Sequence, residues 1–367
     1  MKITRIETFR VAVPLIKPFK TALRTVTIAD SVYVKITCEN GIVGWGEAPP
    51  TLVITGDSLK SIEASIHEVF KPFLLSKSIL QLELLLQGIQ QILVGNVSAK
   101  AAIDMALYDC FSQYCKLPLY QLLGGYNNTL ETDYTVSVND PIEMGEDAVS
   151  YVNQGFNVLK IKVGKDELQT DINRIIEIRR RVGNEIKLRL DANQGWNPKE
   201  AITAIRKMED LGLNIELVEQ PVKAEDIQGL KKVTDSVDTL IMADEAVFTP
   251  KQAFEVLKTR SADLINIKLM KSGGIYRAQI INHLAEVSGM ECMVGSMIET
   301  KLGITAAAHF AASKKNITRY DFDAPLMLAE DIVDGGVQYN GRNITLSDQF
   351  GLGINHILLH NKKENVG

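Results

Sequence analysis

The chain alternates strand-like and helix-like segments from about residue 132 onward, and this alternation restricts its fold more than any other feature. Eight short segments, spaced by roughly 25 residues, are candidate strands. They are Tyr134–Val138, Val158–Val163, Lys187–Leu190, Ile215–Val218, Leu240–Met242, Leu264–Ile267, Cys292–Val294 and Thr318–Tyr320. Because helical segments lie between them, the pattern predicts repeated strand–helix units that close into a (β/α)8 barrel.

The first third of the chain has a different order, with strands followed by helices. Residues 3–13 alternate like a strand, and residues 31–46 predict a hairpin that turns at an Asn-Gly pair. The segment Ile16–Val26 between them has the composition of a loop. Helical periodicity follows, with breaks, up to Tyr114, and Ser98 is the expected N-cap of its last helix. This order predicts a separate α+β domain.

The composition of the chain excludes several classes of protein. Its 367 residues, 46% of them hydrophobic, can bury the cores of two domains. A net charge of −5 with both signs dispersed predicts no nucleic-acid and no membrane partner, and no apolar run approaches the length of a membrane span. The cysteines form no C-x-x-C pair, which is typical of free thiols in a reducing compartment. We therefore expect a cytoplasmic protein.

Two lysines share one face of the second predicted barrel strand. Side chains alternate along a strand, so Lys160 and Lys162 point the same way. Two ammonium groups so close lower each other's pKa, which would make one of them a base near neutral pH. The alternative is an edge strand whose lysines face solvent.

Three consecutive strands of the barrel end in a carboxylate: Asp191, Glu219 and Asp244. The ends of neighbouring barrel strands converge, so these carboxylates repel one another unless a cation lies between them. Oxygen ligands without His or Cys favour Mg²⁺, with Mn²⁺ as the alternative. A single acidic residue after a strand is more often a helix N-cap, but three at matching positions predict a metal site.

A third lysine follows the next strand. Lys268 comes after the carboxylate strands and Lys160 and Lys162 come before them, so ammonium groups face each other across the barrel mouth. This arrangement suits removal of a proton next to a carboxylate, with the metal stabilising the enediolate that forms. Bases on both faces of the substrate carbon can remove a proton from one side and deliver one to the other, which predicts inversion at a stereocentre.

These motifs resemble the motif series of the enolase superfamily, muconate-lactonizing subgroup. The matching segments are Lys160-Ile161-Lys162, Leu190-Asp191-Ala192-Asn193, Val218-Glu219-Gln220-Pro221, Ala243-Asp244-Glu245 and Ile267-Lys268. The resemblance covers essentially the whole chain and implies an α+β capping domain that the C-terminal tail completes. We expect the capping domain at residues 1–125, the barrel at 126–325 and the returning segment at 326–367.

The resemblance also implies a role for each of these residues. Asp191, Glu219 and Asp244 would bind Mg²⁺, and Lys162 and Lys268 would be the two acid/base groups. Lys160 would contact the substrate carboxylate and tune its neighbour Lys162.

The eighth predicted strand distinguishes the reactions of this subgroup. It ends in Asp321 and Asp323, two carboxylates on the same side of an extended segment. With the metal bound elsewhere, this pair is free to receive a substrate ammonium group. An Asp-x-Asp here resembles the dipeptide epimerases, although a pair of loop-capping residues is the alternative.

Four further residues belong to the expected pocket. Arg24, in the N-terminal loop, is suited to bind the side-chain carboxylate of a glutamyl residue, and a solvated surface arginine is the alternative. Thr135 on the first strand and Ser296 and Ile298 after the seventh lie where the resembled family contacts the dipeptide.

Taken together, the sequence and the resemblance predict an isomerase that inverts the C-terminal residue of a dipeptide such as L-Ala-L-Glu, as in the handling of cell-wall peptides. The enzymatic alternatives are an N-succinylamino-acid racemase and an o-succinylbenzoate synthase, which share the lysines and the metal. A non-catalytic metal- or peptide-binding barrel is the alternative of another class. We also expect a homo-oligomer.

Overall fold

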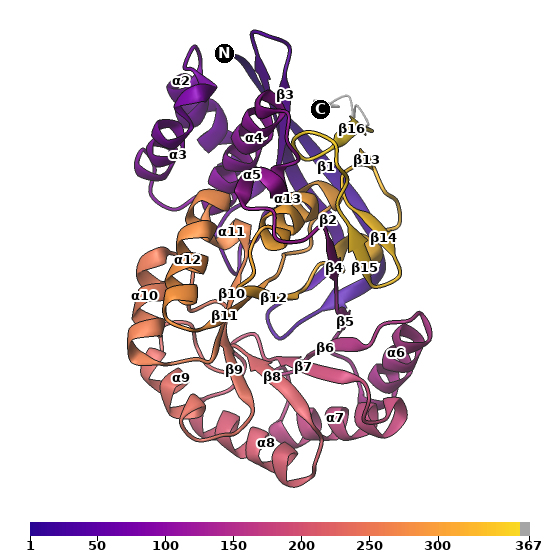
Figure 1. Cartoon of the computed structure of the whole chain (residues 1–367). Helices are drawn as coiled ribbons and strands as arrows, with labels where there is room; N and C mark the ends of the chain where they lie inside the picture. The colour runs from indigo at the N-terminus through magenta and orange to yellow at the C-terminus, as the bar shows by residue number, and fades with distance from the viewer. Residues whose placement is uncertain (360–367) are drawn as a thin grey trace, which may run out of the picture.

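The computed structural model describes residues 1–359, so the last eight residues of the expected C-terminal segment lie outside the described residues. All eight predicted barrel strands are present. They are β5 (Tyr134–Val136), β6 (Val158–Lys162), β7 (Lys187–Asp191), β8 (Ile215–Glu219), β9 (Leu240–Ala243), β10 (Leu264–Ile267), β11 (Glu291–Val294) and β12 (Ile317–Tyr320). They form one parallel sheet in chain order, curled into a barrel with helices outside (Figure 1).

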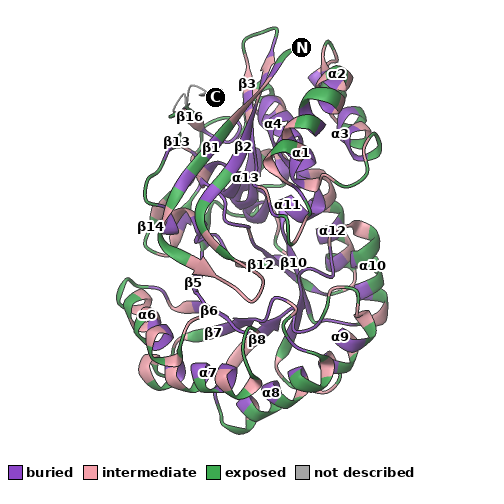
Figure 2. Cartoon of the chain, turned by 180° about the vertical axis from the view of Figure 1, so that it is seen from behind, coloured by how far each residue is buried: buried purple, intermediate pink, exposed green. Residues whose placement is uncertain are grey.

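Helices surround this curled sheet, and most of them have one apolar face that packs against it. Three of them begin with a capping residue followed by proline, namely Asp140-Pro141, Asn197-Pro198 and Thr249-Pro250. The helices are α6 (Pro141–Asn153), α7 (Leu168–Val182), α8 (Pro198–Asp210), α9 (Ile227–Thr234), α10 (Pro250–Thr259), α11 (Leu269–Ser272), α12 (Ile275–Val287) and α13 (Lys301–Ala312). The strands and the inner faces of the helices are buried, and the outer faces of most of the helices are exposed, whereas α11 and α13 are buried almost throughout (Figure 2).

The first and last strands of the sheet, β5 and β12, meet without a continuous ladder in the described part of the chain. Single bonds join the two edges: Asp133 N donates to Tyr320 O (3.3 Å), and Phe322 N donates to Thr132 Oγ1 (2.9 Å). The ends of these two strands are therefore brought to the same place, although the sheet is not sealed by backbone pairing.

A chain of ion pairs crosses the base of the barrel. Arg189 on β7 binds Asp133 (2.9 Å) and Glu216 (2.7 Å). Glu216 also binds Arg319 of β12 (3.0 Å), and Arg319 binds Glu291 of β11 (2.7 Å). Arg189 and Asp133 are buried, so each depends on its partner to offset the cost of desolvation.

The N-terminal part is the predicted α+β unit. A meander of β1 (Ile3–Lys20), β2 (Thr25–Cys38) and β3 (Val43–Ala48) is covered by helices. The helical elements are α1 (Leu59–Ala64), η1 (Ser65–Phe70), α2 (Lys71–Leu74), η2 (Ile79–Gln81), α3 (Leu82–Gln91), α4 (Val97–Cys115) and α5 (Leu119–Leu123).

Two local predictions in this part are wrong. The segment Ile16–Val26 is mostly strand, because β1 and β2 continue past a register shift between Pro14 and Phe19, and only Thr21–Arg24 turns. Ser98 does not cap its helix, since α4 begins at Val97 and the Ser98 N–H itself donates to Asp57 Oδ2 (3.1 Å).

The segment after the barrel returns toward the N-terminal sheet (Figure 1). It comprises η3 (Ala324–Met327), β13 (Val333–Gly335), β14 (Gln338–Asn340), β15 (Asn343–Thr345) and β16 (Ile354–Ile357), and β15 pairs with β4 (Thr129–Glu131). Ala329 N donates to Pro14 O (2.8 Å), and Leu352 N donates to the buried Asp109 (2.9 Å). Over residues 1–359, no helix is both long and apolar enough to span a bilayer.

Candidate active site

A pocket opens at the carboxyl ends of the barrel strands, beneath the turn Thr21–Arg24. Every predicted acid/base and substrate-binding residue lines it. The lining consists of Phe19, Thr21, Leu23, Arg24, Ile54, Thr135, Lys160, Lys162, Asn193, Lys268, Ser296, Met297, Ile298, Asp321 and Asp323. The pocket is thus built from both the barrel and the N-terminal sheet, as expected for chemistry at this end of a barrel.

The register of the sheet brings the predicted metal ligands together. Lys162 lies opposite Asp191 in the ladder between β6 and β7, and Asp191 lies opposite Glu219 in the next ladder. Asp244 directly follows β9, the next strand. All three carboxylates are buried. Three consecutive parallel strands therefore end in acidic groups on one side of the barrel mouth.

Ammonium groups bridge these carboxylates. Lys160 Nζ lies 2.7 Å from Glu219 Oε2 and 3.2 Å from Asp191 Oδ2. Lys162 binds Asp191 (2.6 Å), and Lys268 binds Asp244 (2.8 Å). The site is a buried cluster of alternating charges.

The pKa values of the carboxylates reflect burial and neighbouring charge. Burial and the charge of Asp191 raise the pKa of Glu219 to about 7. Burial also raises the pKa of Asp191, but the ammonium groups of Lys162 and Lys160 outweigh it and lower the value to about 2. Glu219 is the carboxylate that most needs a further cation.

The expectation that the paired lysines have lowered pKa values is wrong for Lys160. Burial lowers its pKa, but the charges of Asp321, Glu219 and Asp191 more than offset this and place the pKa well above its ordinary value. Burial likewise lowers the pKa of Lys268, yet Asp244 and Glu219 raise it above its usual range. The sequence pattern showed the lysines as neighbours but did not show how many carboxylates surround them.

The residues present fit a bound Mg²⁺ ion. Within residues 1–359, no three acidic, imidazole or thiol groups already form a metal cluster, because lysines separate the carboxylates. However, Glu219 is destabilised as an anion by both Asp191 and Asp244, and a divalent cation would relieve this repulsion. The buried Asn193 Oδ1 and Asn266 Oδ1 also accept no hydrogen bond from any described residue. The donor set consists of oxygen atoms, which Mg²⁺ prefers.

The two aspartates after β12 have different partners. Asp321 Oδ2 lies 2.8 Å from Lys160 Nζ, and Asp323 Oδ2 accepts a hydrogen bond from Thr135 N (2.6 Å). Burial and the charge of Asp321 raise the pKa of Asp323 to about 7. Both groups still line the pocket, so each has a surface that a ligand can reach. Asp323 does not cap its own loop, because its side chain makes no capping hydrogen bond to η3 and binds the backbone of β5 instead.

The remaining predicted residues come from the N-terminal turn and from the loop after β11. Arg24 is half-buried, and its side chain has no hydrogen bond or ion pair with any residue of the described range 1–359; burial lowers its pKa. Ser296 Oγ donates to Asp321 O (3.3 Å), and Ile298 is buried beside it in the loop after β11. A desolvated guanidinium without a partner is suited to bind an anionic ligand group.

Sequence reasoning missed several residues of the site. Asn193 has a positive φ of 42° and donates from its backbone N to Asp191 Oδ1 (2.9 Å). Phe19 lies under Lys162, whose Nζ is 5.6 Å from the ring centre. Lys271 is buried and binds Asp244 Oδ1 (2.6 Å). Two of them had a local signal: Asn193 belongs to the motif Leu190-Asp191-Ala192-Asn193, and Lys271 lies one helical turn after Lys268.

Comparison with known proteins gives matches along the whole chain. Residues 3–124 match the family described as mandelate racemase / muconate lactonizing enzyme, N-terminal domain, and residues 143–356 match the family described as enolase C-terminal domain-like. The L-Ala-D/L-Glu epimerase of Bacillus subtilis (strain 168) is 69% identical over 365 residues, which are 99% of this chain and 100% of that protein.

Solved structures give the same result. A substrate-liganded complex of the L-Ala-D/L-Glu epimerase from Bacillus subtilis superposes with a TM-score of 0.97 at 70% identity, covering 98% of this chain and 100% of that one. The dipeptide epimerase of Enterococcus faecalis, complexed with Mg and the dipeptide L-Leu-L-Tyr, superposes with a TM-score of 0.94 at 46% identity. The match covers 97% of this chain and 100% of that one.

Proposed function

The chain belongs to the mandelate racemase and muconate lactonizing enzyme group of the enolase superfamily, and on this basis we propose that it is a Mg²⁺-dependent dipeptide epimerase. It is an isomerase, and its proposed substrate and product are L-Ala-L-Glu and L-Ala-D-Glu. One observation carries the proposal most strongly: Lys162, Lys268, Asp321 and Asp323 line a single pocket together.

The two lysines are placed for proton transfer on opposite sides. Lys162 ends β6 and Lys268 follows β10, and the three strands that carry Asp191, Glu219 and Asp244 lie between them. One lysine removes the α-proton of the C-terminal residue, and the other returns a proton to the opposite face of the same carbon. Mg²⁺ on the three carboxylates supplies a Lewis acid that stabilises charge on the substrate carboxylate.

The other polar groups of the pocket fix the substrate. Lys160 is buried beside the proposed metal ligands and is suited to bind the substrate carboxylate. Asp321 and Asp323 offer negative charge to the N-terminal ammonium of a dipeptide, and Arg24 offers positive charge to the glutamyl side chain. Thr135, Ser296 and Ile298 complete the walls.

The same two aspartates argue against the enzymatic alternatives. An N-succinylamino acid or an o-succinylbenzoate precursor brings an anionic or neutral group to the place where Asp321 and Asp323 present carboxylates, so it offers these two residues no positive charge to bind. A non-catalytic barrel has no need for Lys162 and Lys268 on opposite sides.

A comparison of two substrate classes tests the proposal. The purified protein with Mg²⁺ is incubated separately with L-Ala-L-Glu and with N-succinyl-L-glutamate, and the diastereomers or enantiomers are separated by chiral chromatography. We expect L-Ala-D-Glu from the dipeptide and no D-product from the N-succinyl compound. A D-product from the N-succinyl compound and none from the dipeptide would contradict the proposal and would favour an N-succinylamino-acid racemase.

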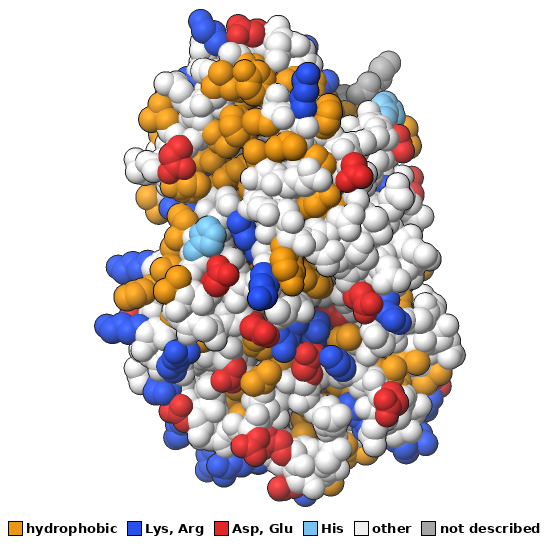
Figure 3. Space-filling view, viewed as in Figure 1, with side chains coloured by type: hydrophobic (Ala, Val, Ile, Leu, Met, Phe, Trp, Pro, Cys, Tyr) orange, Lys and Arg blue, Asp and Glu red, His pale blue; other side chains and the backbone are white. Residues whose placement is uncertain are grey.

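Four further properties are part of the proposal. We assign residues 1–125 to a capping domain, 126–325 to the barrel and 326–367 to the returning segment. We also propose a cytoplasmic location and a role in the handling of cell-wall peptides. We propose a homo-oligomer because Leu84 (56% exposed), Ile92 (45%) and Val94 (92%) leave apolar surface around α3. Hydrophobic side chains gather on this upper half of the face in Figure 3. Light scattering after size-exclusion chromatography tests the oligomer.

A further inference from the structure

One wall of the pocket is the loop Gly295–Thr300 between β11 and α13. Ser296, Met297 and Ile298 of this loop line the pocket. The opposite wall comes from the N-terminal sheet, where Phe19, Leu23 and Arg24 line it. The width of the pocket therefore depends on how the N-terminal sheet is held against this barrel loop.

The carboxylate of Glu47 joins the two walls. Glu47 is fully buried on β3, where it lies opposite Tyr33 of β2. Its Oε1 accepts from Thr300 N (2.9 Å) and from Ser31 Oγ (2.9 Å). Its Oε2 accepts from Thr300 Oγ1 (2.7 Å) and from Gly303 N (2.7 Å). Both oxygens thus bind the first turn of α13, and Glu47 is held to its own sheet through Ser31.

The first turn of α13 is shaped to receive this carboxylate. Gly303 has no side chain, and a Cβ there would clash with Glu299 Oε2 and lie 3.0 Å from Glu47 Oε2. Thr300 is the N-cap of α13 and also forms a short hydrogen bond with the Tyr33 hydroxyl. A buried anion is stabilised at such a helix N-terminus by the unpaired N–H groups and the helix dipole.

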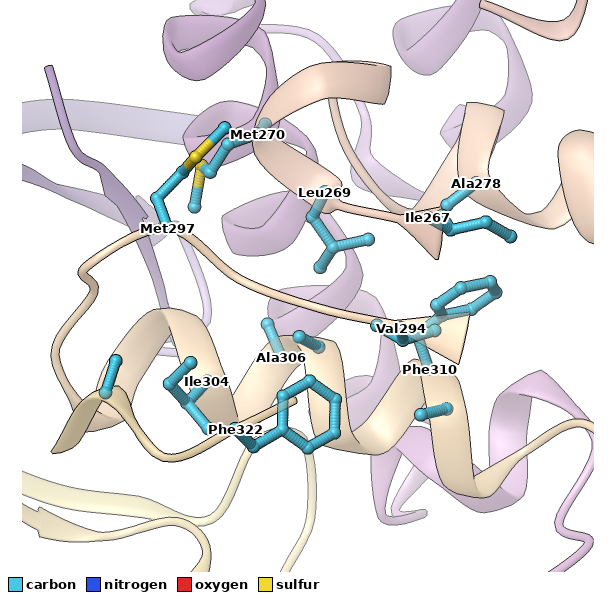
Figure 4. Close-up of a cluster of buried hydrophobic side chains, with 14 of the residues drawn as sticks. Ile267, Leu269, Met270, Ala278, Val294, Met297, Ile304, Ala306, Phe310 and Phe322 are labelled. Atoms are coloured by element: carbon cyan, nitrogen blue, oxygen red, sulfur yellow. The ribbon is translucent and has the colours of Figure 1, made fainter. Parts of the chain in front are cut away.

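The pocket loop is held from within as well. Glu299 Oε1 accepts a hydrogen bond from Met297 N (2.9 Å), which fixes the chain just before Thr300. On its other side the loop packs into an apolar cluster, in which Met297 points toward Met270 (Figure 4). Apolar packing tolerates small sliding movements, whereas four hydrogen bonds to one carboxylate fix a direction. The Glu47 contacts therefore define the position of the loop.

We propose that Glu47 is a positioning residue: by binding Thr300 and Gly303 it fixes Met297 and Ile298 against the turn Thr21–Arg24 and so sets the affinity for substrate. The proposal rests on the proposed function for its kinetic consequence. Its structural consequence, a loop ordered by the N-terminal sheet, is independent of that function.

The variants separate this role from general docking of the two domains. Glu47→Gln places an amide N–H against the Gly303 N–H or the Thr300 N–H. Thr300→Val keeps the shape but removes the hydroxyl that donates to Glu47, accepts from Leu302 N and bonds to the Tyr33 hydroxyl. Thr300→Ser keeps the hydroxyl and is the conservative control. Asp104→Asn is the matched control, because Asp104 is also buried and caps a barrel helix, α12, through Ile275 N (2.6 Å) and Tyr276 N (3.2 Å), yet α12 carries no pocket residue.

Kinetics and hydrogen exchange are measured on all four variants with Mg²⁺. We expect Glu47→Gln and Thr300→Val to raise the KM for L-Ala-L-Glu about tenfold while kcat changes little, since misplacement of a binding wall by a fraction of an ångström has such effects. Amide exchange should accelerate in residues 295–303 in these two variants, and Thr300→Ser and Asp104→Asn should leave both readouts near the wild type.

Two results would contradict the proposed role of Glu47. Unchanged exchange in residues 295–303 of Glu47→Gln, or an equal rise of KM in Asp104→Asn, would overturn the role of Glu47. If the wild-type protein does not epimerise any dipeptide, the proposed function fails, and the exchange measurement alone still supports or overturns the positioning of the loop.

Discussion

Lys160 Nζ lies 2.8 Å from Asp321 Oδ2, and this ion pair ties β6 to the segment after β12 across the intervening strand β5. The same ammonium group contacts Asp191 and Glu219. One buried lysine therefore links the proposed metal ligands to the proposed ammonium site of the substrate.

Replacing Lys160 should lower the free energy of unfolding more in the metal-free protein than in the protein with Mg²⁺. In Lys160→Met, three buried carboxylates lose a shared cation, which costs about 3–5 kcal/mol of the free energy of unfolding. Mg²⁺ would neutralise Asp191 and Glu219 and should restore part of this loss. Urea denaturation in EDTA and in Mg²⁺ measures the difference, with the exposed Lys187→Met as control. An equal loss under both conditions would contradict the shared-cation account.

The affinity for dipeptide should fall in mild acid. The pKa of Asp323 is raised to about 7 by burial and by Asp321, so this carboxylate becomes neutral as the pH falls below that value. A neutral acid binds an ammonium group poorly, so kcat/KM should drop about tenfold per pH unit below the pKa. Saturating Mg²⁺ is required, because burial and Asp191 also raise the pKa of Glu219.

The variant Asp323→Asn identifies the group responsible. It should weaken dipeptide binding at pH 8 and flatten the acid limb of the profile. An acid limb that persists unchanged in Asp323→Asn would assign the titration to another residue.

Arg24 should select for an acidic second residue. Its half-buried guanidinium has no side-chain partner within residues 1–359, and a charge-assisted bond to a glutamyl carboxylate is worth about 1.5–3 kcal/mol. In Arg24→Met, kcat/KM for L-Ala-L-Glu should fall about 10- to 100-fold. The isosteric, neutral L-Ala-L-Gln is the control substrate and should be affected little. Equal losses of kcat/KM on both dipeptides would show that Arg24 does not bind the glutamyl carboxylate.

The ion pairs at the base of the barrel should govern stability rather than catalysis. Glu216→Gln weakens the contacts to Arg189 and Arg319 and leaves the buried Arg189 with its ion pair to Asp133, at a cost of about 2–3 kcal/mol. The control Glu177→Gln weakens the ion pairs with Arg180 and Arg181 at the surface of α7 and should change the stability much less, because water screens such pairs. Urea denaturation and kcat/KM are measured together. A loss of activity at unchanged stability would contradict this assignment.

The sequence was sufficient for those parts of the site that follow local rules. Asp191 and Glu219 end apolar runs of strand length, and the barrel rule brings consecutive strand ends together. The location of Lys268 across the carboxylates followed from chain order alone.

Other contacts had no local signal. Glu47 and Thr300 are 253 residues apart and meet only because the N-terminal sheet packs on the barrel. The strand character of Ile16–Val26 was hidden by Pro14 and Pro18, which normally interrupt strands but are tolerated here next to a register shift. The raised pKa of Lys160 depends on carboxylates from β7, β8 and the end of β12, which no pattern within β6 could show.

The most direct test of two-base proton transfer is proton NMR of L-Ala-L-Glu in D₂O with Mg²⁺, following the glutamyl α-proton. The wild-type protein should replace this proton by deuterium and form the L,D diastereomer. Lys162→Met and Lys268→Met should each form no L,D product, and only one of the two should still exchange the α-proton of the L,L dipeptide. The exposed Lys199→Met should behave as the wild type. Formation of the L,D product by either lysine variant would contradict the account.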